Sequence, residues 1–432
     1  MGYILNPDLI ISPLNEDFFC VVNPCIPNGI KVINRNQHAV LKRIAICDFD
    51  ENETGDPAMD NFIAAVLKKE FICNGAKFSH PKPFHGKIRN IDFWIHLSDA
   101  CNLDCPYCSI QTKPRKTRLN AKDTLHIVET IVIFVRSEGI TSLSIRFGGG
   151  EPLLNFTQVE VIVRGLRSQL PETCRLELLL ITNLTLLTAS QLDFIAQNDI
   201  SVCVSLDGTE EYHNRTRNFN GKGSFQLIER NMELLEQRHV PYHISSVISN
   251  RNLDGLEEFV EYLIRKNIVF RLSLVRGEEF DFEKAILVFE AVYKTFERHI
   301  LSGYEFTRYH NLCNLSFFQP RLLTCGSGIN SFAIYTNGDL YPCTHRIGDD
   351  TQCSGNICTP GLLKNLLTRP FSPKASFHSD CIECKYKYLC TNACPLFHTA
   401  GKSVFCEFNQ KMIPEVYRLI GLERLQNIKN RK

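Results

Sequence analysis

The cysteines of this 432-residue chain constrain its fold more than any other sequence feature. Ten of the 19 cysteines fall between Cys313 and Cys406, and three more lie between Cys101 and Cys108. We expect a chain without a secretory signal to sit in a reducing compartment, where clustered cysteines are more often metal ligands than disulfides. The pattern therefore predicts two metal-binding segments. The six scattered cysteines are interpreted as buried, inert thiols.

Charge and hydropathy exclude several classes of function. The formal net charge is +1, so no global basic field favours nucleic acid or a membrane surface. Residues 1–19 lack a basic segment followed by an apolar core, and no uninterrupted apolar run reaches membrane-spanning length. We therefore expect a cytoplasmic protein with neither nucleic-acid nor membrane partners.

The middle of the chain, from about residue 90 to residue 300, alternates short apolar segments with amphipathic ones. This alternation predicts βαβ units and a parallel sheet, with helices over 122–137, 225–238 and 253–266. The six expected strands are 93–98, 143–147, 176–182, 201–206, 242–248 and 269–274. Six units are too few for a closed eight-stranded barrel, so we predict an α/β fold with an open, partial (β/α)6 barrel.

The flanking regions differ from this pattern. The first 88 residues contain segments typical of strand, strand, helix, helix and strand, in that order, at 17–24, 29–36, 37–44, 57–69 and 71–78. Residues 310–410 are rich in Cys, Gly and Asn, which favours a segment held by metal sites more than by its own core. The tail after Met412 is typical of an amphipathic helix, which we expect to be solvated.

The segment CNLDCPYC directly follows the first expected strand of the barrel. Cys101, Cys105 and Cys108 form a Cys-x3-Cys-x2-Cys spacing on a short loop. Such a loop can direct three thiolates at three corners of a four-iron cluster. Three protein ligands leave one iron open, and an open metal position binds substrate or cofactor. A zinc site would favour a second, partner pair of cysteines, which this segment lacks.

This spacing, with Tyr107 before the last cysteine, resembles the signature of the radical SAM superfamily. Downstream, Gly149, Gly150 and Glu151 match the family's motif for the amino group of S-adenosylmethionine (SAM). Glycines allow the backbone to approach a ligand closely, and an acid accepts a hydrogen bond from an ammonium group. The resemblance implies that the cysteines of the CNLDCPYC loop hold a SAM-binding [4Fe-4S] cluster.

Two later strand ends extend the resemblance, because in the family such ends face the ribose and carboxylate of SAM. Thr182 and Asn183 end one expected strand, and Ser205 and Arg217 follow another. A hydroxyl suits a sugar and Arg suits a carboxylate, so we expect Ser205 and Arg217 to contact SAM. Asp207 either contacts SAM or caps the following turn.

The cysteines of the C-terminal third resemble the seven-cysteine SPASM extension, which implies two auxiliary [4Fe-4S] clusters. The implied ligands are Cys325, Cys343 and Cys394 for an inner cluster, and Cys381, Cys384, Cys390 and Cys406 for an outer one. Some family members have a fourth inner ligand where this chain has Ser331. Either the inner cluster keeps an open iron, or Cys313, Cys353 or Cys358 completes it. A zinc-ribbon-like module is the alternative to the SPASM assignment.

The element order of the N-terminal region resembles a PqqD-type winged-helix domain. Such domains bind the leader of a ribosomal precursor peptide by adding it as a strand to a sheet edge. A purely structural cap is the alternative. The implied domains are 1–88 for leader recognition, 89–305 for the radical SAM partial barrel, 306–412 for the SPASM domain and 413–432 for a C-terminal helix.

Together these resemblances imply an oxidoreductase that cleaves SAM reductively and uses the 5′-deoxyadenosyl radical to modify a ribosomally made precursor peptide. The expected product is an intramolecular thioether or carbon–carbon crosslink. The implied cofactors are SAM and three [4Fe-4S] clusters, and the partners are the precursor and an electron donor such as flavodoxin or ferredoxin. No catalytic base is assigned.

Two alternatives stay open at this point. The first is an anaerobic sulfatase-maturing enzyme, which generates formylglycine. That family places an Asp directly after the second SPASM cysteine, where this chain has Thr344 and then His345. The second is a non-catalytic iron–sulfur redox relay, which would leave the SAM-facing residues idle.

Overall fold

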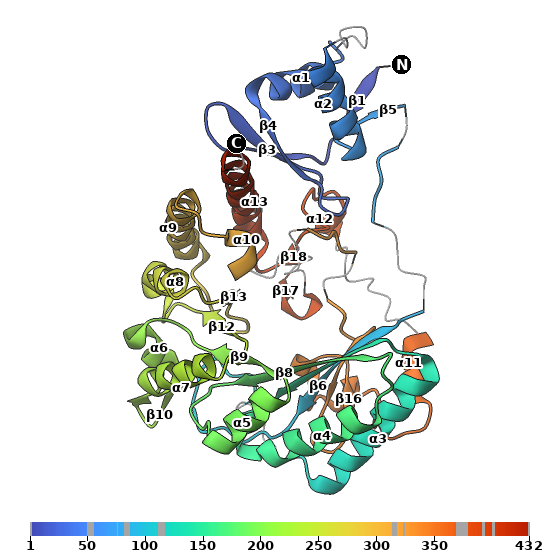
Figure 1. Ribbon diagram of the computed structural model, residues 1–432, viewed down its shortest axis with the longest axis vertical. Helices are drawn as coiled ribbons and strands as arrows, with labels where there is room; N and C mark the ends of the chain where they lie inside the picture. The colour runs from blue at the N-terminus through green and yellow to red at the C-terminus, as the bar shows by residue number, and fades with distance from the viewer. Residues whose placement is uncertain are drawn as a thin grey trace.

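A computed structural model shows three successive regions: an N-terminal domain, a central β/α sheet and a C-terminal cysteine-rich region (Figure 1). The structure describes residues 2–49, 56–75, 77–81, 87–110, 117–312, 318–322, 325–368, 379–390, 394–399 and 402–430.

Six parallel strands form the centre of the main sheet, and each coincides with one of the predicted strands. They are β6 (Asn90–His96), β7 (Ser142–Gly148), β8 (Arg175–Thr182), β9 (Ser201–Ser205), β12 (Tyr242–Ile248) and β13 (Phe270–Leu274). Neighbouring strands pair in parallel, because a helical crossover separates each from the next. The predicted α/β fold is therefore confirmed.

Amphipathic helices make these crossovers and bury one face against the sheet. They are α3 (Ala121–Glu138), α4 (Phe156–Gln169), α5 (Ala189–Gln197), α6 (Glu210–Thr216), α7 (Phe225–Gln237), α8 (Leu256–Arg265) and α9 (Phe282–Leu301). Short 3-10 turns, η2 (Pro152–Asn155) and η3 (Leu253–Gly255), and a small hairpin, β10 (Asn218–Phe219) and β11 (Lys222–Gly223), lie between them. The sequence sets the ends of α3 locally: the Asn120 side chain caps its first turn, and Gly139 adopts the left-handed conformation after its last.

Three further strands widen this sheet beyond the predicted six. They are β14 (His310–Leu312), β15 (Ser331–Ile334) and β16 (Leu340–Tyr341), and the strand order is β14-β13-β12-β9-β8-β7-β6-β15-β16. Within the described residues the two outermost strands do not pair with each other, so the barrel stays open. Because β15 pairs with β6, the C-terminal region is held in place by the main sheet, in addition to any metal sites.

The N-terminal domain has the predicted strands and helices and adds two short strands at its start. Its elements are β1 (Tyr3–Leu5), β2 (Ile10–Pro13), β3 (Phe18–Val22), β4 (Ile30–Asn34), α1 (Arg35–Ala45), α2 (Pro57–Lys68) and β5 (Ile72–Asn74). Strands β2, β3 and β4 form one antiparallel sheet, and β1 pairs with β5. One face of the three-stranded sheet packs on α1 and α2 through Val21 and Ile33.

The opposite face of that sheet packs on the C-terminal helix α13 (Cys406–Lys429), which Figure 1 shows in dark red beside β3 and β4. Cys20 and Ile10 of the sheet share one core with Tyr417 and Ile420 of the helix. The prediction of a solvated helix after Met412 is therefore wrong. The helix also begins at Cys406, so the expected boundary at 412 falls inside it.

The rest of the C-terminal region consists of short elements joined by turns. They are α10 (Phe306–Tyr309), η4 (Thr344–Arg346), η5 (Asp350–Gln352), α11 (Leu362–Thr368), α12 (Ser379–Ile382), η6 (Pro395–Phe397), β17 (His398–Thr399) and β18 (Lys402–Ser403). None of the helices in the described ranges combines the length and the apolarity needed to cross a bilayer.

Candidate active site

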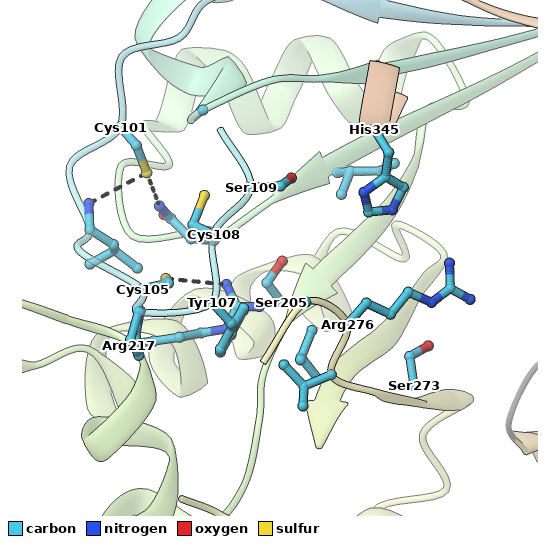
Figure 2. Close-up of a pocket in the computed structure, with 18 of the residues that line it drawn as sticks. Cys101, Cys105, Tyr107, Cys108, Ser109, Ser205, Arg217, Ser273, Arg276 and His345 are labelled. Atoms are coloured by element: carbon cyan, nitrogen blue, oxygen red, sulfur yellow. Dashed lines mark hydrogen bonds between the residues drawn. The ribbon is translucent and has the colours of Figure 1, made fainter. Parts of the chain in front are cut away.

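A cavity of about 640 Å³ lies at the carboxyl ends of the sheet strands. Figure 2 shows the loop after β6 on one side of it, with His345 and Arg276 on the other. Nine of the predicted cofactor-binding or metal-ligating residues line this cavity: Cys101, Cys105, Tyr107, Cys108, Gly149, Gly150, Asn183, Ser205 and Arg217. The fold thus brings these nine residues, which come from separate segments of the sequence, to one cavity.

The glycines after β7 let two loops approach each other closely. Gly150 N donates to Ser98 O at 2.6 Å, and Glu151 N donates to Ala100 O at 2.8 Å. A Cβ on Gly149 would lie 2.5 Å from Ser98 O, and a Cβ on Gly150 would lie 2.3 Å from Ala100 O. Any larger residue here would displace the loop that carries the three cysteines.

Polar groups from neighbouring strand ends surround the cysteine sulfurs. Asn183 Nδ2 lies 3.8 Å from Cys101 Sγ, and Arg217 Nη1 lies 3.9 Å from Cys105 Sγ. Burial raises the pKa of Cys101, and it raises the pKa of Cys105 to about 12 although the charge of Arg217 opposes this. These thiols are thus protonated until a metal replaces the proton.

The donors of the loop after β6 suit an iron–sulfur cluster. Cys101, Cys105 and Cys108 line the same cavity, and cysteine thiolates are the ligands that hold such clusters in proteins.

Asp207 lies beneath the cavity wall and does not line the cavity. Its buried carboxylate accepts hydrogen bonds from Arg217 Nε at 2.8 Å, from Val247 N at 2.9 Å, and from the Tyr107 hydroxyl. The sequence predicts two possible roles for Asp207, SAM contact or a cap of the following turn. The geometry favours neither, because the carboxylate joins Arg217, Tyr107 and the backbone of β12. The carboxylate orients Arg217, whose guanidinium carbon lies 5.5 Å from the Tyr107 ring centre.

Glu151 is also fully buried and turned away from the cavity. Its carboxylate accepts from Thr182 Oγ1 at 2.6 Å, Asn183 N at 2.8 Å and Leu153 N at 3.0 Å. Burial raises the pKa of Glu151 to about 7, although these hydrogen bonds oppose the shift. In this arrangement Glu151 fixes the end of β8, and through it Asn183, beside the cysteine loop.

A polar network that was not among the predicted site residues lies on the other side of that loop. The Asp99 carboxylate accepts from Tyr335 Oη at 2.6 Å and Thr117 N at 3.1 Å, and it bonds to His96 Nε2 at 2.8 Å. Burial opposes ionisation of Asp99, but the bonds from His96 and Tyr335 lower its pKa to about 2. The polar residues His96 and Asp99 at the end of an apolar strand were the available signal, whereas Tyr335 is distant in sequence.

Residues from the end of β13 onward and from the C-terminal region complete the cavity wall, and these were also missed. Ser273, Arg276 and Glu278 contribute from the first segment, and His345 and Phe397 from the second. Arg276 stacks over Phe397, with its guanidinium carbon 5.4 Å from the ring centre. The sequence predicted the strand but gave no signal for the side chains that follow it.

The three cysteines predicted for the inner auxiliary cluster lie near one another and near the cavity. Burial raises the pKa of Cys343 and Cys394, and Cys325 adds an electrostatic contribution to both. His345 follows Cys343 by two residues, and Phe397 follows Cys394 by three, so the same turns carry the cavity residues.

Among the cysteines predicted for the outer cluster, Cys381 and Cys384 share a turn and Cys390 contacts the first turns of α13. Cys384 N donates to Cys381 O at 3.2 Å, which makes a tight turn between them. Cys390 Sγ accepts from Asn409 Nδ2 at 3.4 Å, and Asn409 lies in the first turns of the helix that begins with Cys406.

The candidates for a fourth inner ligand occupy different surroundings. Cys353 Sγ lies 3.8 Å from Gly355 O, and its side chain packs against the small cluster that includes Tyr335 and Tyr341. Cys358 is exposed. Cys313 lies outside the described residues.

The comparisons with known proteins agree with this architecture. The family model described as Radical SAM superfamily matches residues 95–263. A cysteine-type anaerobic sulfatase-maturating enzyme of Clostridium perfringens is 25% identical over 321 residues, which cover 69% of this chain and 86% of that protein. An uncharacterized protein of Methanocaldococcus jannaschii is 34% identical over 193 residues, which are 43% of this chain and 63% of that protein.

Two solved structures share the fold. The structure of anSMEcpe with bound AdoMet and Cp18Cys peptide matches with a TM-score of 0.64 and 20% identity, over 77% of this chain and 98% of that one. SuiB of Streptococcus suis bound to precursor peptide SuiA matches with a TM-score of 0.54 and 15% identity, over 93% of this chain and 98% of that one. Residues 95–263 therefore carry a radical SAM domain, and the relatives of the chain include anaerobic sulfatase-maturating enzymes.

Proposed function

We propose that this radical SAM protein is an enzyme that modifies a peptide. The observation that carries the proposal is the shared cavity, because the cysteine loop and the C-terminal cysteine-rich region line the same space. A substrate in that space would contact both regions at once. Two structurally similar proteins, anSMEcpe and SuiB, have been solved with bound peptides, so a peptide is the substrate class we propose.

In this proposal Cys101, Cys105 and Cys108 hold a [4Fe-4S] cluster. With SAM bound, such a cluster supplies a carbon-centred radical by reductive cleavage, using an electron from a donor of the flavodoxin or ferredoxin type. The chain's own residues bind, orient and exclude water. Asn183 and Arg217, which lie close to two of the sulfurs, stabilise thiolate charge.

The proposed SAM contacts come from three strand ends. The guanidinium of Arg217 suits a carboxylate, the hydroxyl of Ser205 suits a polar group of SAM, and the backbone of Gly149 and Gly150 allows close approach. Tyr107 shares the cavity wall with Arg217. We assign Asp207 and Glu151 to positioning, because their carboxylates are bonded within the protein.

We further propose two auxiliary [4Fe-4S] clusters, the inner one on Cys325, Cys343 and Cys394 and the outer one on Cys381, Cys384, Cys390 and Cys406. Three clusters predict about twelve irons per chain. The inner set is the nearer to the cavity, since His345 and Phe397 belong to the turns that carry it. A cluster held by this set would supply a redox centre beside the substrate space.

The N-terminal domain is proposed to bind the leader of the precursor, and a groove beside β4 supports this. The groove has a volume of about 420 Å³ and is lined by Ile30, Lys31, Val32, Lys69, Arg424, Asn427 and Ile428. Its charged side chains are all basic, and burial together with their mutual repulsion lowers the pKa of Lys69. Glu423, adjacent to Arg424 in sequence, is buried and bonded to Thr307 N.

The outer edge of β4 faces this groove. Arg424 donates to Ile30 O at 2.7 Å, so the polar backbone groups of Ile30 point away from β3. In an antiparallel pair this direction recurs at every second residue, so those of Val32 point the same way. An extended, acidic leader segment would pair there and meet the three cations.

A sulfatase-maturing activity is the second candidate, favoured by the anaerobic sulfatase-maturating enzymes among the relatives. His345 lines the cavity near the position where that family carries an Asp, so this chain offers an imidazole in place of a carboxylate. Incubation with a Cys- or Ser-containing sulfatase peptide separates the two candidates, because formylglycine formation at a rate typical of a maturase would favour the second.

The test of the proposed function begins with anaerobically reconstituted enzyme, SAM and dithionite. The wild type should release 5′-deoxyadenosine, and the triple variant Cys101→Ala, Cys105→Ala, Cys108→Ala should release none while losing about four irons. Cys47→Ser is the matched control and should keep both values, because this thiol of the N-terminal domain is exposed, contrary to the expectation that the scattered cysteines are buried. Continued SAM cleavage by the triple variant would refute the assignment, as would a wild type that never cleaves SAM.

A further inference from the structure

Three potential metal ligands meet in the N-terminal domain. They lie outside the radical SAM domain, and none of them is a ligand of the proposed clusters. Asp8 precedes β2, Cys25 lies in the turn between β3 and β4, and His80 lies in the segment that leads from the domain toward the main sheet. One ligand atom from each lies within 4.8 Å of the other two. Cys25 Sγ and Asp8 Oδ2 are 3.6 Å apart.

We propose that Asp8, Cys25 and His80 bind a zinc ion that fixes the segment containing His80 to the N-terminal domain. A thiolate, an imidazole and a carboxylate are all ligands that zinc accepts, and the mixture of soft and borderline donors disfavours magnesium and calcium. Water would fill the fourth tetrahedral position.

The observed spacing matches the geometry of a tetrahedral zinc site. Bonds of about 2.3 Å to sulfur and about 2.0 Å to oxygen place those two ligands about 3.5 Å apart. The 3.6 Å separation of Cys25 Sγ and Asp8 Oδ2 is close to that value. The alternative is a thiol that donates a hydrogen bond to Asp8, and metal content distinguishes the two.

A shell of hydrogen bonds centred on Glu70 holds all three ligands in place. The buried side chains of Asn6 and Asn23 both donate to Glu70 O, at 3.0 and 3.1 Å. Their amide oxygens in turn accept from Asp8 N at 2.9 Å and from Cys25 N at 3.0 Å. Two separate turns are thereby fixed on one carbonyl oxygen.

The side chain of the same residue fixes the third ligand. The Glu70 carboxylate accepts from Ser79 N at 2.6 Å and from Ser79 Oγ at 2.8 Å, and Ser79 directly precedes His80. Glu70 itself has a φ of 50°, a left-handed conformation that costs a non-glycine residue free energy. Outer hydrogen bonds that orient the ligands are typical of protein metal sites.

The charge around the site is compatible with a cation. The carboxylates of Asp8 and Glu70 both act electrostatically on Cys25, and Lys387 is the cation that opposes them. His80 also lies beside Tyr388, with ring centres 6.2 Å apart, so the ion would stabilise the domain against the cysteine-rich region.

The test uses full-length protein, purified anaerobically from zinc-supplemented cells with its iron–sulfur clusters reconstituted. Elemental analysis should give one zinc per chain beside the iron. X-ray absorption at the zinc edge, which iron does not contribute to, should show one sulfur ligand and two or three nitrogen or oxygen ligands. His80→Ala, at an exposed position that the fold tolerates, and Cys25→Ser should each weaken zinc binding more than about 100-fold, since loss of a direct ligand exceeds the effect of an outer one.

Two controls make the outcome decisive. Cys47→Ser, an exposed thiol of the same domain, should keep zinc at the wild-type level. Iron content should be equal in all variants, because no proposed cluster ligand has changed. Wild-type protein without zinc, zinc in an all-sulfur shell, or full zinc retention by His80→Ala and Cys25→Ser would each overturn the proposal, and none of these results bears on the proposed peptide modification.

Discussion

The pair formed by Asp207 and Arg217 determines how the proposed SAM site keeps its shape. Arg217 reaches the cavity, whereas Asp207 is completely buried behind it and joins Arg217, Tyr107 and the backbone of β12. A buried charge pair of this kind contributes little net stability, but removing one partner leaves the other unpaired and costly. The pair therefore sets the position of the guanidinium more than it stabilises the fold.

The first prediction concerns the affinity for SAM. Arg217→Ala should weaken SAM binding by about 1.5–3 kcal/mol, the contribution of a charge-assisted hydrogen bond, or roughly 10- to 100-fold. Arg215→Ala is the matched control, because Arg215 lies two residues away, is half exposed and forms its ion pair with Glu211, outside the cavity. Isothermal titration of SAM into reconstituted protein measures both. Equal affinities for the two variants would show that Arg217 is not the carboxylate anchor.

The second prediction follows from the fully buried carboxyl of Glu151, whose pKa rises from an ordinary value near 4.5 to about 7. Between these two pKa values, Glu151 is deprotonated in the unfolded chain but still protonated in the native chain. The free energy of unfolding therefore falls as the pH rises through this range, and Glu151 causes no further change above about pH 7. The integrated effect is up to about 3 kcal/mol. Glu151→Gln cannot ionise, so its melting temperature relative to wild type should rise between pH 5.5 and 7.5.

Thermal unfolding of both proteins without SAM, in buffers matched for ionic strength, measures that difference. The amide introduced by Glu151→Gln loses part of the hydrogen bonding to Thr182 and Asn183, so the variant starts with a constant penalty. Only the change with pH tests the idea. A melting-temperature difference that stays constant over the whole range would show that Glu151 titrates at its ordinary pKa.

At the scale of residues, the sequence predicted which residues lie around the cavity but not the direction in which their side chains point. Cys101, Asn183 and Arg217 belong to separate strand ends, and a parallel sheet brings such ends together. Whether a carboxylate faces the cavity depends on donors elsewhere in the chain. Glu151 and Asp207 turn inward because Thr182, Val247 and neighbouring groups satisfy them there, and spacing alone does not encode this.

At the scale of elements, hydrophobic periodicity predicted the six strands from β6 to β13 because each is a short apolar run followed by an amphipathic helix. It missed β1, β2 and β15, which have only three or four residues and too little periodicity for a pattern. Strand β15 owes its structure to pairing with β6, more than 230 residues away. Such pairing is a tertiary effect, so local sequence does not reveal it.

The third prediction addresses the fourth ligand of the proposed inner cluster. Cys353 packs against the apolar cluster behind β15 with Tyr335 and Tyr341, whereas the thiols that act electrostatically on Cys343 are Cys394 and Cys325. Cys353→Ser should therefore leave iron at the wild-type content, whereas Cys343→Ala should lose up to about four irons. Iron analysis and Mössbauer spectroscopy measure the two variants. Loss of a cluster from Cys353→Ser would instead favour completion of the site by this cysteine.

At the scale of the whole molecule, the C-terminal helix joins the two ends of the chain. Helix α13 packs on α9 of the β/α region and on the open face of the β2–β4 sheet, so it links the N-terminal domain to the rest of the protein. Ser12 Oγ donates to Pro414 O at 3.3 Å, and Arg424 donates to Ile30 O at 2.7 Å. Deleting residues 1–88 would expose the apolar face of α13. A point substitution therefore tests the contact between the helix and the N-terminal sheet more directly.

The last prediction uses Gly421, a position where α13 lies directly against the N-terminal sheet. A Cβ there would lie 2.6 Å from Cys20 Cβ and 2.9 Å from Leu14 Cδ2, so no larger residue fits without moving the two elements apart. Gly421→Val should cost about 1–3 kcal/mol by overpacking. The expected effect is local, because the residues that line the cavity come from the main sheet and from turns of the C-terminal region, and none of them belongs to α13 or to the N-terminal domain.

Hydrogen exchange measured by mass spectrometry tests this prediction. Amides of β2, β3 and β4 should exchange faster in Gly421→Val, while those of β6, β7 and β8 keep their protection and the reconstituted enzyme cleaves SAM at the wild-type rate. Lys411→Val, which places the same β-branched residue at an exposed position of the same helix, separates overpacking from the lower helix propensity of valine. If exchange rises equally in the main sheet, the N-terminal domain and the main sheet unfold as one unit. The N-terminal domain would then depend on α13 for its fold and not only for its position.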